Sequence, residues 1–122
     1  MKNKIDSVLD QALAYINIRK NSLQVSDLQK ANIDINIKGG AGESLLQNAI
    51  IEAATTGDVK REKLCMALIK FLIKNNLGIN VNDEDEKTSL HYAACLASPD
   101  ILRLLIDKGG KFWLKKIKGR MQ

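Results

Sequence analysis

Apolar residues recur along this chain at intervals of three and four, the spacing that places side chains on one face of an α-helix. The first such stripe predicts an amphipathic helix over residues 5–20; it consists of Ile5, Val8, Leu9, Ala12, Leu13 and Ile16. A later stripe is wider; it consists of Leu64, Leu68, Phe71 and Leu72, flanked by Met66, Ile69 and Ile73. Because a stripe this wide is expected of a helix held between two neighbours, we predict a buried helix over residues 59–75.

Polar residues with helix-capping chemistry mark where the later helices begin. Asp58 precedes the wide stripe and can accept hydrogen bonds from the first free N–H groups of the helix, with Glu62 near its positive end. Ser98 and Pro99 form a second start signal, because proline has the dihedral angle that the first helical position requires. These signals predict three helix pairs, which are residues 5–20 with 22–31, 44–55 with 59–75, and 88–96 with 99–108.

The last two pairs align with each other in sequence. The dipeptide Ile35-Asn36 recurs as Ile79-Asn80, and eight residues after each asparagine the segments 44–49 and 88–93 correspond. The second of these reads Thr88-Ser89-Leu90-His91-Tyr92-Ala93. Preceded by a polar turn and followed by a helix that ends at glycine, it resembles the Thr-Pro-Leu-His-x-Ala signature of an ankyrin repeat. Ser89 replaces the usual proline, and Glu86 replaces the usual glycine of the turn.

The resemblance covers residues 25–112 and implies an all-α fold, an ankyrin-like helical solenoid of about three helix-turn-helix repeats with short turns. We expect one domain over residues 1–122, made of an N-terminal capping repeat (1–36), a long repeat (37–80), the best-matching repeat (81–112) and a basic C-terminal cap or tail (113–122). The period of 44 residues exceeds the usual 33 by about 11. We place this insertion near residues 53–62, which contain loop and cap residues.

Composition and charge add two features to this picture. Only 4% of the residues are aromatic, so the core must be aliphatic. The net charge of +5 belongs to the C-terminal end, because residues 108–122 contain six basic side chains and no acidic one. Two interpretations of residues 111–122 stay open. They form an amphipathic cap on the last repeat, or they contact an anionic membrane or nucleic acid.

Catalytic and metal-binding chemistry finds little support in these residues. His91 is the only histidine, and the resemblance gives it a structural role in the turn. The acidic run 82–86 does not have the spacing of a calcium-binding loop, and the glycine-rich segment 38–42 lacks the Gly-Lys-Ser/Thr of a phosphate loop. With one histidine and two cysteines 30 residues apart, no zinc pattern is present either. We therefore expect no enzyme activity, no cofactor and no small-molecule substrate.

The expected function is binding of another protein through the turn tips and the concave helix face, as the resemblance implies. The candidate contact residues are Lys38, Asn48, Asn82, Asp83, Glu84, Asp85, Lys87, Tyr92 and Cys95. The acidic tip at 82–86 is either an acidic finger offered to a basic partner or simply a solvated turn. Two alternatives remain beside this function. One is a bacterial toxin-neutralising or host-directed ankyrin protein; the other is an adaptor that uses the basic tail.

The expected location is the cytoplasm. The basic N-terminal segment is not followed by the apolar stretch of a Sec signal peptide, although secretion by another route is compatible with the sequence. Cys65 and Cys95 are then expected to be reduced, and a disulfide would require that they approach in space.

Overall fold

The computed structural model describes residues 4–79, 81–95 and 98–109. Its helices are α1 (Lys4–Arg19), the single 3₁₀ turn η1 (Lys20–Ser22), α2 (Val25–Lys30), α3 (Leu45–Thr55), α4 (Val59–Lys74), α5 (Ser89–Cys95) and α6 (Pro99–Gly109). Over these residues the only β-type pairing is one antiparallel bridge between Lys38 and Ser44. The predicted all-α class and the three helix pairs are confirmed.

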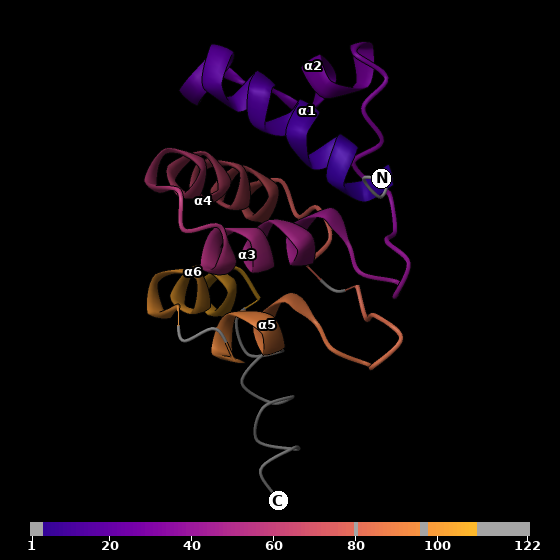
Figure 1. Cartoon of the computed structure of the whole chain (residues 1–122), viewed down its shortest axis with the longest axis vertical. Helices are drawn as coiled ribbons and strands as arrows, with labels where there is room; N and C mark the ends of the chain where they lie inside the picture. The colour runs from indigo at the N-terminus through magenta and orange to yellow at the C-terminus, as the bar shows by residue number, and fades with distance from the viewer. Residues whose placement is uncertain (1–3, 80, 96–97, 110–122) are drawn as a thin grey trace, which may run out of the picture.

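The helix pairs stack in the order in which they occur along the chain. α1 packs against α3, and α3 packs against α5. α4 and α6 form a second layer beside them (Figure 1). The long segments that lead into α3 and α5 project away from that second layer, on the right of the view. This arrangement is the predicted ankyrin-like solenoid.

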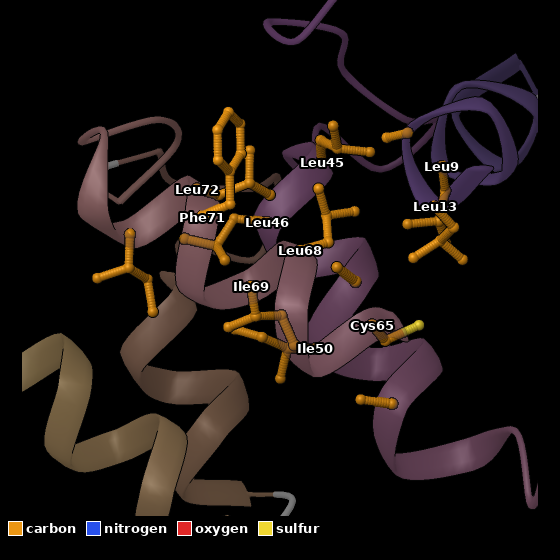
Figure 2. Close-up of a cluster of buried hydrophobic side chains, with 14 of the residues drawn as sticks. Leu9, Leu13, Leu45, Leu46, Ile50, Cys65, Leu68, Ile69, Phe71 and Leu72 are labelled. Carbon is orange, nitrogen blue, oxygen red and sulfur yellow. The ribbon is translucent and has the colours of Figure 1, made fainter. Parts of the chain in front are cut away.

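Figure 2 shows the aliphatic core, which is built around α4. Side chains from three helices meet there: Leu9 and Leu13 of α1, Leu45, Leu46 and Ile50 of α3, and Cys65, Leu68, Ile69, Phe71 and Leu72 of α4. The wide apolar stripe of α4 is needed because this helix contacts α1, α3 and α6. The expectation of a helix held between neighbours is therefore confirmed.

The predicted cap of α4 forms as expected, and a neighbouring arginine ties three helices together. The Asp58 carboxylate accepts hydrogen bonds from the backbone N–H groups of Lys60 and Arg61, at 3.0 and 3.3 Å. The Arg61 guanidinium donates to Asp10 of α1 at 2.7 Å and to Glu52 of α3 at 2.6 Å. Hydrogen bonds to these two carboxylates raise the arginine pKa, so the side chain stays charged and links both layers.

The extra length of the middle unit lies mostly within its two helices. The loop between α3 and α4 is short, since α3 ends at Thr55 and α4 begins at Val59. α3 and α4 are instead 11 and 16 residues long, against 7 and 11 for α5 and α6. Most of the additional residues therefore lengthen the helices, at the end of α3 and the start of α4. The region near 53–62, where the insertion was expected, consists of these helix ends and the short loop between them.

The two cysteines lie in different environments. Cys65 is buried in the core, Cys95 is exposed at the end of α5, and both are free thiols. No helix within the described ranges is both long and apolar enough to cross a membrane. The C-terminal segment 111–122, for which a cap or a binding tail was expected, lies outside the described residues.

Candidate functional site

Two hairpin-like loops, one before α3 and one before α5, carry most of the residues that the sequence proposed for binding. We call residues 38–44 the first finger and residues 81–88 the second finger. In the first finger, Gly39 N–H donates to the carbonyl of Glu43 at 2.8 Å, and Gly42 N–H donates to the carbonyl of Gly39 at 3.0 Å. The Glu43 carboxylate accepts from the N–H of Ala41 at 3.0 Å. These bonds close a tight turn at the tip.

The second finger is organised by the carboxylate of Asp83. One carboxylate oxygen accepts the backbone N–H groups of Asp85 and Lys87, both at 2.9 Å, and the other accepts the hydroxyl of Tyr92. The backbone of Asp83 pairs with Lys87 and Glu86 at 3.0 and 2.9 Å. Glu86, at the position where the repeat usually has glycine, adopts the left-handed conformation with φ of 60°. The turn thus keeps its shape without that glycine.

Asp83 was predicted to be a contact residue in the acidic tip, but the structure buries it. Only 6% of its surface is exposed, and its carboxylate is used inside the turn. Burial alone would raise the pKa of this carboxyl, but the hydrogen bonds from Tyr92, Lys87 and Asp85 outweigh it and lower the pKa below its ordinary value. Burial and the adjacent Asp83 raise the pKa of Tyr92 to about 12. Both side chains therefore hold the turn together.

The two fingers are joined through their backbones. The N–H of Glu84 donates to the carbonyl of Ala41 at 2.8 Å, so the tip of one finger rests on the tip of the other. Gly42 lies at this contact with φ of +77°, and a Cβ added to it would come within 3.3 Å of the Glu84 nitrogen. Glycine thus serves both the turn and the close approach.

A buried glutamine links the helix of one repeat to the finger of the next. Gln47 has no exposed surface. Its side-chain oxygen accepts the N–H of Ser44 at 2.7 Å, and its amide nitrogen donates to the carbonyls of Val81 and Lys87 at 3.1 and 2.7 Å. Gln47 was not among the predicted contact residues, and the signal for it in the sequence is its alignment with His91.

His91 has a comparable structural position in the last repeat. Its Nδ1 accepts the backbone N–H of Thr88 at 3.0 Å, as the Gln47 oxygen does for Ser44. Because Nδ1 is an acceptor, the neutral ring carries its proton on Nε2. This geometry agrees with the structural role in the turn that the resemblance implies for His91.

The nine predicted contact residues fall into three groups by exposure. Six are exposed, and these are Lys38, Asn82, Glu84, Asp85, Lys87 and Cys95. Asn48 and Tyr92 are half-buried, and each side chain bonds to another residue of the chain, Asn48 to Asp6 at 3.3 Å and Tyr92 to Asp83. Asp83 is buried. The structure therefore brings five exposed side chains together on or beside the fingers, with Cys95 at the end of α5.

This arrangement offers a preformed surface with charged side chains. Within residues 4–79, 81–95 and 98–109, no group of three or more potential metal ligands converges. The exposed groups of the second finger are carboxylates, an amide and one lysine. Such groups can form hydrogen bonds and ion pairs with another macromolecule.

Comparisons with known proteins agree with the repeat architecture. One relative is the E3 ubiquitin-protein ligase hecd-1 of Caenorhabditis elegans, which is 27% identical over 96 residues. The aligned region is 79% of this chain but only 3% of that protein. No solved structure matches the chain significantly. A family model of ankyrin repeats, with three copies, matches residues 13–116. Since that match covers most of its length, this chain belongs to the ankyrin repeat family.

Proposed function

We propose that this chain is a non-catalytic binding module that holds a partner protein against its two fingers and the adjoining ends of α3 and α5. Ankyrin repeats are generally protein–protein interaction modules, which supports the class of function. The enzymatic activity in the name of the nematode relative is not extended to this chain, since the aligned region is 3% of that protein.

The observation that carries the proposal is the combination of a fixed backbone with exposed side chains at the fingers. The bond between Glu84 and Ala41 and the two bonds from Gln47 hold the second finger in place. The side chains of Glu84 and Asp85 nevertheless point into solvent. Because little order has to be imposed when a partner arrives, a fixed surface of this kind lowers the entropic cost of binding.

The charge of the second finger indicates what the partner surface contains. Glu84, Asp85 and Glu86 are exposed in succession, with only Lys87 of opposite sign beside them. We therefore propose that the partner presents basic side chains to this tip, which would accelerate association and fix its orientation.

Affinity capture from lysate of the source organism tests the proposal. The informative variant is Glu84→Lys/Asp85→Lys, because both side chains are exposed and neither builds the turn. Asp83 is unsuitable as a target, since replacing it would break the turn itself. The matched control is Asp100→Lys/Asp107→Lys, which changes the charge equally on the exposed side of α6. Circular dichroism verifies that all three proteins are folded.

The proposal predicts a protein that the wild type and the α6 control capture and that the finger variant loses. Salt should weaken the capture, because exposed charges are screened at high ionic strength. Equal capture by all three proteins would exclude the second finger as the contact surface, and capture of nothing by the wild type would count against a stable partner in that lysate.

A further inference from the structure

A gap lies between α4 and the segment that links α1 to α2. α2 has six residues and α4 has sixteen, which corresponds to lengths of about 9 Å and about 24 Å. α6 packs against α4, whereas α2 contacts α4 at most marginally. The contact of the first repeat with α4 is made mainly by α1, and it leaves the α4 surface that faces η1 and the start of α2 open.

A groove occupies this gap. It encloses about 1390 Å³ and lies between α4 and the segment that runs from the end of α1 through η1 to the start of α2. Apolar side chains from both walls contribute to it, namely Ile16, Leu23, Val25, Leu64, Met66 and Phe71. The groove is larger than the usual small-molecule site of roughly 300–1000 Å³, and it is open to solvent.

The charged side chains around the groove are mostly of one sign. Four exposed lysines line it, Lys20 on η1 and Lys63, Lys70 and Lys74 on α4, while the single acidic residue is Glu62. The three lysines of α4 are separated by seven and four residues, so they lie along one face of the helix. Exposed Ala67 lies on the same face between Lys63 and Lys70.

We propose that this groove binds an acidic amphipathic helix of a partner protein, which lies along α4 between this helix and the segment from η1 to the start of α2. Its apolar face would lie against the floor, and acidic side chains at its edges would pair with the lysines. The site lies on the second layer, away from the fingers, so it is a second surface and does not depend on the function proposed above.

Other occupants fit these features less well. Nucleic acid is recognised by basic residues with interleaved aromatic side chains, and Phe71 is the single aromatic residue of this groove, with 9% of its surface exposed. A bilayer surface would meet the exposed lysines but not the apolar residues, which lie between the two walls. An acidic helix satisfies both the apolar floor and the basic rim.

A display library of random 16-residue peptides tests the proposal. Peptides are selected on the full wild-type chain and counter-selected on Lys63→Glu/Lys70→Glu, and the survivors are synthesised and measured by fluorescence anisotropy. The control Lys30→Glu/Lys60→Glu changes the net charge equally at exposed positions outside the groove. If the charge reversal prevents folding, the neutral pair Lys63→Gln/Lys70→Gln replaces it. Vesicles that contain phosphatidylserine form a separate arm.

We expect the selected peptides to carry apolar residues three and four positions apart with glutamate or aspartate beside them. Their binding should weaken about ten-fold or more in the charge-reversed variant and stay unchanged in the control, and it should weaken as salt increases. Survivors without acidic residues or helical spacing would overturn the proposal. So would a selection that yields no lysine-dependent peptide, or lysine-dependent binding to vesicles alone.

Discussion

Replacement of Gln47 by alanine tests how the repeats are coupled. The side chain is fully buried and makes three hydrogen bonds, one to the start of its own helix and two to the second finger. Gln47→Ala leaves the N–H of Ser44 and the carbonyls of Val81 and Lys87 without these partners. Since the finger lies 34 to 40 residues away in sequence, the loss affects contacts between repeats and not only one helix.

The magnitude follows from the number of bonds lost. Each hydrogen bond contributes about 0.5–1.5 kcal/mol net, and buried groups left unpaired cost more. The variant regains side-chain entropy of up to about 2 kcal/mol, which offsets part of the loss. We therefore expect Gln47→Ala to lower the free energy of unfolding by about 2–4 kcal/mol. With a slope of about 1–3 kcal/mol/M, the urea midpoint should fall by about 1 M or more.

Urea denaturation followed by circular dichroism measures this change. Gln29→Ala is the matched control, because Gln29 is exposed on α2 and its replacement should change stability by less than about 0.5 kcal/mol. Gln47→His should lose less than Gln47→Ala, since the aligned His91 accepts an equivalent backbone N–H through Nδ1. A loss below about 0.5 kcal/mol for Gln47→Ala would refute the idea that this amide couples the repeats.

Three further predictions follow from other parts of the structure. Arg61→Ala should lower the free energy of unfolding by about 1–2 kcal/mol. The loss is modest because the arginine and its two carboxylate partners are each about a third exposed, and high salt should reduce it. Asp83→Asn should flatten the acid side of the curve of unfolding free energy against pH. The folded-state pKa of Asp83 is lowered, so its contribution is present above about pH 4 and is lost as the pH falls through that folded pKa. Ellman's reagent should label Cys95 rapidly in the native protein and Cys65 only on unfolding, because Cys65 is buried and its pKa is raised to about 11. Rapid labelling of both thiols in the native protein would contradict this packing.

The helices could be predicted from the sequence because their signals are local. The apolar stripe of α4 and the cap at Asp58 lie within a few residues of each other in the sequence. They predicted a helix over residues 59–75, and the structure has α4 at Val59–Lys74. The exposed character of Glu84 and Asp85 could also be expected, since they occur in a run of charged residues between two helices.

What the sequence did not show depends on contacts between distant residues. Asp83 belongs to the same acidic run as Asp85, and only the fold shows that its carboxylate turns inward to Tyr92. Gln47 donates to carbonyls of the next repeat, at Val81 and Lys87, and the sequence around Gln47 does not predict these partners. The groove beside α4 depends on which helices of the first repeat pack against it, and the pattern of apolar residues does not predict that α1 does so and α2 hardly does.

Site-specific photocrosslinking in the source organism tests the central claim, that the fingers are a protein-binding surface, most directly. A photoreactive amino acid is placed at Asp85 on the second finger and, as a control, at Lys30 at the end of α2; both positions are exposed. Binding of a partner at the fingers predicts a discrete protein adduct from position 85 and none from position 30. Adducts of equal yield from both positions, or an adduct from position 30 alone, would contradict it.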